Sequence, residues 1–226
     1  MNCLLCNARL PIRLTLADLV MLRPLPRLTL CNRCRANFAR IDPAHACPGC
    51  GRPQKGTRLC AECVAWQQHC GWHLSHQALY TYNNNAMKEY MHRYKFAGDY
   101  RLRLVFQAEL QARVRELAAD VVVPIPVTET TMAIRGFNQV LGLLGETSVA
   151  PVLRHRARDK LAQSHKTRKE RLRTPQPFEL VDPTMVRGKR VLLVDDIYTT
   201  GRTLYHAADL IKGAQCRELV SLSLAR

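Results

Sequence analysis

Residues 191–203 read VLLVDDIYTTGRT and carry the strongest structural signal in this chain of 226 residues. The apolar run at 190–194 predicts a buried strand, with Asp195 and Asp196 at its carboxyl end. A turn rich in hydroxyl groups follows, and residues 203–212 have the apolar spacing of a helix that Gly213 ends. Because ligands of open α/β sheets bind at the carboxyl ends of strands, the segment predicts a strand, a ligand-binding turn and a helix.

The side chains of this segment suit a sugar phosphate. Adjacent carboxylates at positions 195 and 196 suit the vicinal hydroxyls of a ribose, or a Mg²⁺ ion held among them. The hydroxyls and amides of the turn and the helix N-terminus favour a phosphate, and Gly201 lets the backbone approach closely. An acidic N-cap after an ordinary strand is the simpler alternative. The complete pattern favours the sugar phosphate.

The flanking sequence predicts further strands and helices. Strands are predicted at 78–82, 121–125, 151–153, 190–194 and 219–224, and helices at 87–94, 102–117, 137–145 and 203–212. Strands that alternate with helices indicate a mostly parallel sheet flanked by helices. Residues 76–226 are therefore predicted to form one α/β domain.

The first part of the chain has a different chemistry. Nine of the ten cysteines lie within residues 1–70, and eight of them form four C-x-x-C pairs. Such a pair aims two sulfurs at one ion, and a tetrahedral zinc takes two pairs. The predicted ligands of two structural zinc ions are Cys3, Cys6, Cys31, Cys34, Cys47, Cys50, Cys60 and Cys63. Sequential pairing of the motifs is the simplest arrangement, and a cross-braced pairing stays open.

Disulfides or unrelated free thiols are the alternatives to zinc. The N-terminus lacks a positive segment followed by a long apolar run, and residues 12–30 are interrupted by charges and prolines. We therefore expect no transmembrane segment and a cytoplasmic protein, in which thiols stay reduced. Residues 1–70 are predicted to be a double zinc-ribbon domain. The remaining thiols, Cys70 and Cys216, are expected to be buried apolar groups.

The charge balance favours anionic partners. The chain has 34 Lys and Arg residues against 18 Asp and Glu residues, a formal net charge of +16. Such an excess favours nucleic acid, phosphorylated small molecules or an anionic membrane surface, without choosing among them.

Residues 191–203 resemble the phosphoribosyl-pyrophosphate (PRPP) signature of type I phosphoribosyltransferases. Two further elements narrow the resemblance: VPIP at 123–126 followed by RGFNQ at 135–139, and YKFAGD at 94–99. Together with the cysteine-rich region, they resemble the ComF/GntX family over essentially the whole chain. The resemblance implies a type I phosphoribosyltransferase-like parallel sheet flanked by helices, behind an N-terminal zinc-ribbon region.

The resemblance also implies the residues of the site. Asp195 and Asp196 are the expected catalytic pair and bind the ribose hydroxyls, with Mg²⁺ accompanying PRPP. The loop at 127–135 approaches pyrophosphate, and Arg135 is its only cation. Lys95 is the other candidate for pyrophosphate, with a solvated helix end as the alternative. The predicted PRPP-binding residues are Asp195, Asp196, Ile197, Tyr198, Thr199, Thr200, Gly201, Arg202, Thr203, Arg135 and Lys95.

A basic segment at 154–173 predicts a long loop, because it holds nine Lys and Arg residues and few large apolar ones. Gln163, Arg171 and Phe178 resemble a loop pattern of the same family. The segment can close over the reacting centre, contact the phosphates of a nucleic acid, or be a solvated charge run. A mixture of the first two roles is our expectation.

Four ring side chains near the end of the cysteine region admit two interpretations. Trp66, His69, Trp72 and His73 can form a platform on which single-stranded bases stack. Packing between the two predicted domains is the favoured interpretation, because Trp is mostly buried in proteins.

Two functions from different classes follow. The first is a protein of the ComF/GntX type that acts in uptake or utilisation of single-stranded DNA through a PRPP- and Mg²⁺-binding domain. Its implied partners include DNA-uptake machinery at the inner membrane. The alternative is an active phosphoribosyltransferase of nucleotide metabolism, with an unidentified base or amine as acceptor. A regulator that binds duplex DNA and responds to PRPP is a third, weaker possibility. The absence of a recognisable helix-turn-helix motif in the sequence counts against it.

Overall fold

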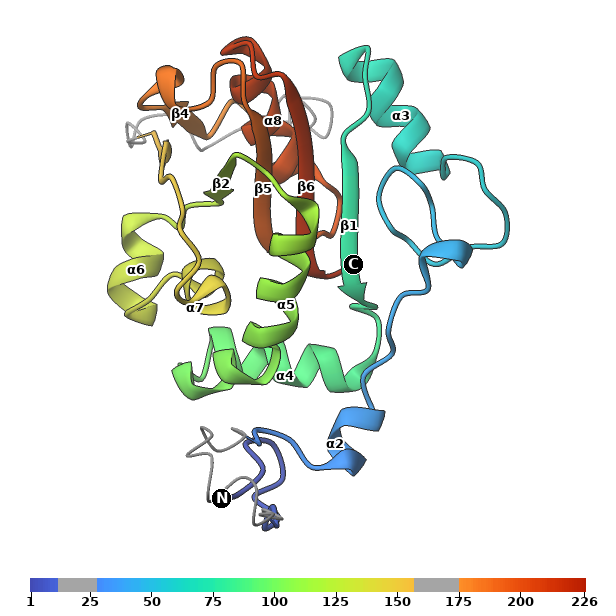
Figure 1. Ribbon diagram of the computed structural model, residues 1–226, viewed down its shortest axis with the longest axis vertical. Helices are drawn as coiled ribbons and strands as arrows, with labels where there is room; N and C mark the ends of the chain where they lie inside the picture. Colours follow the sequence, from blue (N-terminus) through green and yellow to red (C-terminus); the bar gives the residue numbers. More distant parts are fainter. Residues whose placement is uncertain (12–27, 157–174) are drawn as a thin grey trace, which may run out of the picture.

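The computed structural model describes residues 1–11, 28–156 and 175–226 (Figure 1). The predictions for the basic segment, including Gln163 and Arg171, fall mostly outside these residues. So does most of the interrupted apolar stretch at 12–30. Within the described residues, no helix is long and apolar enough to cross a membrane.

A four-stranded parallel sheet stands at the centre, in the order β1-β6-β5-β2. Its strands are β1 (Ser75–Tyr80), β2 (Val121–Pro124), β5 (Arg190–Ile197) and β6 (Glu218–Ala225). The near-continuous apolar runs of β2 and β5 agree with burial on both faces of a parallel sheet. β5 is longer than predicted, so the acids at 195 and 196 lie within the strand rather than after it.

Helices cover both faces of the sheet, and alternate residues of β5 point into the two cores. One core joins Leu192 and Val194 to α4 (Asn85–Lys95), α5 (Arg103–Leu117) and α7 (Gln139–Leu144). The other joins Val191 and Leu193 to α8 (Arg202–Gly213). The predicted parallel sheet with flanking helices is confirmed.

The cysteine-rich part divides between the two cores. Figure 1 shows residues 1–11 and α2 (Asn32–Ala36) below α4, and α3 (Ala61–Cys70) beside β1 at the other end of the molecule. Phe38 packs edge-on against Tyr80, Tyr90 and Phe106 in the first core. Residues 47–63 pack toward the second core. The division into domains at 1–70 and 76–226 stays a prediction.

Two local predictions were wrong. The loop expected at 127–135 contains helix α6 (Glu129–Arg135), because Thr128 caps its first turn and Gly136, at φ +80°, closes its end. The strand expected at 151–153 lies at β3 (Leu153–His155) and pairs with β4 (Phe178–Leu180), which the sequence analysis missed.

Candidate functional site

A cavity of 910 Å³ opens at the carboxyl ends of β2 and β5. It is lined by Tyr82, Asn85, Lys88, Glu89, Met91, His92, Lys95, Phe96, Ile125, Pro126, Gln139, His155, Pro177, Phe178, Asp195, Asp196, Ile197, Thr199 and Thr203. One wall carries the predicted acids and hydroxyls, and α4 supplies the opposite wall.

The two acids at the end of β5 are buried together. Asp195 is 7% exposed and Asp196 is 3% exposed. Burial raises the pKa of Asp195 well above its usual value, and the neighbouring Asp196 charge adds to that rise. The Asp196 amide donates to Asp195 Oδ1 at 2.9 Å. A buried carboxyl pair facing a cavity is an arrangement that a cationic or hydroxyl-rich ligand would relieve.

A small network of polar contacts holds Asp196. Its Oδ2 forms an ion pair with Lys95 at the end of α4, and its Oδ1 accepts from Gln139 Nε2 at 3.1 Å. Lys95 is not a solvated helix end, because its side chain is only 16% exposed. Arg135 does not line the cavity; its guanidinium donates to the Lys95 carbonyl at 3.0 Å and to Gln139. Arg135 therefore positions two residues that face Asp196.

The turn after β5 presents two faces. Thr199 and Thr203 line the cavity beside Ile197. Tyr198 instead points to the opposite side, where its buried ring lies 4.5 Å from the ring of His76. Gly201 has φ +80°, and a Cβ there would lie 2.3 Å from Tyr198 Oη, so the turn requires glycine. Thr200 and Arg202 line a separate cavity of 810 Å³ beside α3.

Both tryptophans pack, as favoured by the sequence analysis. Trp66 stacks on Tyr205 of α8, with ring centroids 4.2 Å apart and planes 7° apart. Trp72 also contacts Tyr205, at 5.4 Å, and Lys212 lies over its ring. Cys70 and Cys216 are half-buried, and burial raises the pKa of both thiols.

Sequence reasoning missed the α4 wall of the cavity. The wall includes Asn85, Lys88, Glu89 and His92, and the sequence analysis predicted only a helix at 87–94 without assigning these residues a role. Polar residues between the apolar positions of a helix give no signal of their own, because most such faces meet solvent.

The eight paired cysteines gather in two groups. Cys3, Cys6, Cys31 and Cys34 form the first, and Cys47, Cys50, Cys60 and Cys63 form the second, with all sulfurs of a group within 4.8 Å of one another. The pairing is therefore sequential, and the cross-braced alternative is wrong.

Zinc fits both groups. A tetrahedral ion with Zn–S bonds of about 2.3 Å requires sulfurs about 3.8 Å apart. The Sγ atoms of Cys6 and Cys31 lie 3.7 Å apart, as do those of Cys50 and Cys60. Gly49 makes room in the second group, since a Cβ there would lie 2.8 Å from Cys63 Sγ. Four thiolates leave no open coordination position, so the groups suit structural rather than catalytic zinc.

The parallel sheet, the acid pair at the end of β5 and the turn that follows define a phosphoribosyltransferase-type domain. Residues 114–226 match the family described as "Phosphoribosyl transferase domain". The chain is 37% identical over 226 residues to "Competence protein ComFC" of Streptococcus pneumoniae, covering 100% of both chains. It is 32% identical to "Competence protein ComFC" of Bacillus subtilis, covering 99% of this chain and 94% of that one.

A third relative is more distant. "Competence protein F" of Haemophilus influenzae is 25% identical over 224 residues, covering 87% of this chain and 96% of that protein. The chain belongs to the ComF family of competence proteins, as the sequence motifs indicated.

Proposed function

We propose that this protein binds PRPP with Mg²⁺ in the 910 Å³ cavity and acts in the handling of single-stranded DNA during its uptake or utilisation. The observation that carries the binding proposal is the buried acid pair at the end of β5, directly before a hydroxyl turn and a helix N-terminus. The names of the relatives, which are competence proteins, support the DNA role.

Each part of the site has a proposed task. Asp195 and Asp196 accept hydrogen bonds from the ribose hydroxyls, and the hydroxyls of Thr199 and Thr203, with amides of the turn, hold the 5-phosphate. Mg²⁺ would supply charge neutralisation for the pyrophosphate when bound. Lys95, released from Asp196 by the ligand, would turn its ammonium group to the same pyrophosphate.

Calorimetric titration of PRPP with Mg²⁺ into the zinc-loaded protein tests the binding proposal. We expect saturable binding, and about a hundredfold weaker binding after Asp195→Asn with Asp196→Asn, because charged hydrogen bonds are lost. Lys95→Met should weaken PRPP about tenfold and leave ribose 5-phosphate, which lacks pyrophosphate, unaffected. Absence of binding to the parent protein, or equal binding by the double variant, would overturn the proposal.

A transferase activity is the second candidate, and the α4 wall favours it. The cavity continues past the acids to Asn85, Glu89 and His92, which offer donors and acceptors to an acceptor molecule. Positioning of the two reactants would account for catalysis. Pyrophosphate release with a panel of bases and amines tests this activity. Release no faster than that of the double variant would exclude it for that panel.

A further inference from the structure

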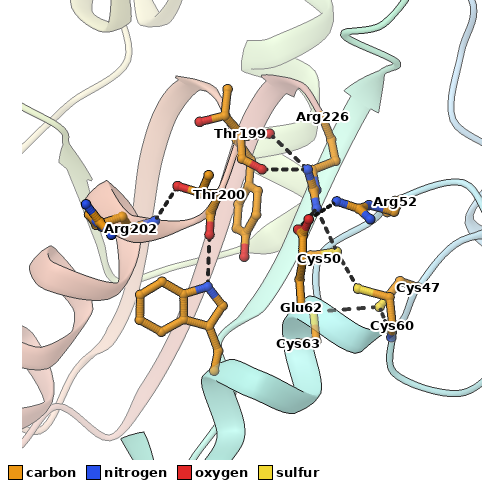
Figure 2. A network of polar contacts seen from close by, with 12 residues as sticks. Cys47, Cys50, Arg52, Cys60, Glu62, Cys63, Thr199, Thr200, Arg202 and Arg226 are labelled. Atoms are coloured by element: carbon orange, nitrogen blue, oxygen red, sulfur yellow. Dashed lines mark hydrogen bonds and ion pairs between the residues drawn. The ribbon is translucent and has the colours of Figure 1, made fainter. Parts of the chain in front are cut away.

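The second cysteine group contacts the turn at residues 199–203, called the phosphate turn below, through one guanidinium. Arg226, which follows β6, lies between Cys50 and Thr199 (Figure 2). Its Nη2 donates to Cys50 Sγ at 3.5 Å and to Glu62 Oε2 at 2.9 Å, and its Nη1 donates to the Thr199 carbonyl at 2.7 Å. The Arg226 side chain is only 7% exposed. One buried cation thus bonds a metal-ligating sulfur and the ligand-binding turn.

A second side chain of the cysteine region holds the next carbonyl of the turn. Helix α3 starts inside the Cys60–Cys63 motif and carries Trp66. Trp66 Nε1 donates to the Thr200 carbonyl at 2.8 Å while its ring stacks on Tyr205. The carbonyls of residues 199 and 200 are therefore both fixed from the side of the second cysteine group (Figure 2).

Fixing these carbonyls orients the amides that a phosphate needs. In a trans peptide the C=O and N–H groups of one unit point in opposite directions. When Arg226 and Trp66 hold the carbonyls of Thr199 and Thr200, the N–H groups of Thr200 and Gly201 face away from the cysteine region. Amides held in this way need little reorganisation to bind an anion.

The metal state of the group changes the anchor of Arg226. Four thiolates around one zinc ion carry a net negative charge, which attracts the guanidinium beside Cys50. Loss of the metal frees the motif that holds Glu62, the second partner of Arg226.

The first cysteine group lies elsewhere. It packs below α4, where Arg93 donates to the carbonyls of Leu4 and Leu5 at 3.1 and 3.0 Å (Figure 1). Arg93 therefore contacts the backbone of the first cysteine motif, whereas Arg226 contacts Cys50 itself and the turn at residue 199.

We propose that the second cysteine group is a metal-dependent support of the phosphate turn, and that Arg226 is the positioning residue that connects them. The part of this inference that concerns ligand affinity rests on the proposed PRPP binding. The part that concerns the conformation of the phosphate turn does not depend on a ligand.

Arginine-to-glutamine variants of the full chain separate the two groups. Three quantities are measured for Arg226→Gln and Arg93→Gln. They are the zinc content, the hydrogen exchange of the amides at 199–203 without ligand, and the Kd for PRPP with Mg²⁺. We expect Arg226→Gln to keep both zinc ions, to exchange the turn amides about tenfold faster and to bind PRPP about tenfold more weakly, since it loses charged hydrogen bonds. Arg93→Gln should have the same amide exchange rates at 199–203 and the same Kd for PRPP as the parent protein.

A third variant tests the metal. Cys60→Ser should lose one zinc ion of two and exchange the turn amides at least as fast as Arg226→Gln, while core amides of β5 keep parent rates. Unchanged turn exchange in Arg226→Gln, or equal effects of Arg226→Gln and Arg93→Gln, would overturn the inference. If the parent does not bind PRPP, the proposed function fails, and the exchange rates still decide the support of the turn.

Discussion

Asp195 is a carboxyl whose burial costs stability. Burial, with the charge of Asp196, raises its pKa well above the usual value. The folded state therefore holds the Asp195 proton more tightly than the unfolded chain does. Stability is lost as the pH rises from the unfolded value of about 4 through the folded pKa. Burial of this carboxyl therefore lowers the stability of the fold at neutral pH relative to its stability near pH 4.

Asp195→Asn should stabilise the ligand-free protein. Asparagine keeps an oxygen to accept from the Asp196 amide, at 2.9 Å in the parent, and removes the ionisation. We expect a gain of about 1 kcal/mol in the free energy of unfolding at pH 7.5, vanishing toward pH 4. Urea denaturation at the two pH values measures it. A gain in the free energy of unfolding that is the same at both pH values would mean that packing, and not the ionisation of Asp195, causes the difference.

Single residues could be predicted from the sequence where their signal is local. Asp195, Asp196 and the paired cysteines lie in short motifs, and the residue types and spacing of these motifs predict the kind of ligand. Arg226 could not be predicted, because its partner Cys50 is 176 positions away and only the fold brings them together. The same holds for the ion pair between Lys95 and Asp196.

At the scale of elements, the turn before α8 depends on one glycine. Gly201→Ala places a Cβ against the buried ring of Tyr198 at a φ of +80°. We expect a loss of about 1–3 kcal/mol in the free energy of unfolding and a large loss of PRPP affinity. Gly213→Ala, in the last turn of the same helix, meets no atom within 4 Å and should be neutral or slightly stabilising. Equal effects of the two variants would contradict this account.

Elements with a long apolar stripe were the ones that sequence periodicity predicted. α4, α5 and α8 bury several residues each, and β5 and β6 bury long runs. α6 buries no residue, so only its caps indicated a helix, and its threonines favoured a loop. β4 is three residues long, too short for a periodic signal.

At the scale of the whole molecule, the order of the motifs was enough to predict the class of protein. It was not enough to predict where the two cysteine groups lie in the fold. The spacing between motifs left their pairing open. Only the structure sends one group to α4 and the other to the phosphate turn. The proposed coupling between metal and ligand could therefore not be predicted from the sequence.

The net charge of +16 leads to a prediction about how the affinity for DNA depends on salt concentration. If the protein handles single-stranded DNA, its cations displace counterions from the phosphates, so affinity must fall steeply with salt. We expect the logarithm of the association constant for a fluorescent oligothymidine to fall linearly with the logarithm of KCl concentration. The slope should be about −0.7 for each phosphate neutralised. Anisotropy titrations at several salt concentrations measure it.

Charge-matched variants locate the DNA-binding cations. Replacing Lys166, Arg168 and Lys169 by Gln should make the slope shallower by about 2, if each neutralises one phosphate. Replacing the exposed Arg33, Lys55 and Arg58 by Gln removes the same charge from the cysteine region and should change the slope less. An affinity that does not vary with salt, or no binding at low salt, would reject single-stranded DNA as a direct ligand. In that case PRPP binding would stand alone as the activity that the acid pair at 195 and 196 supports.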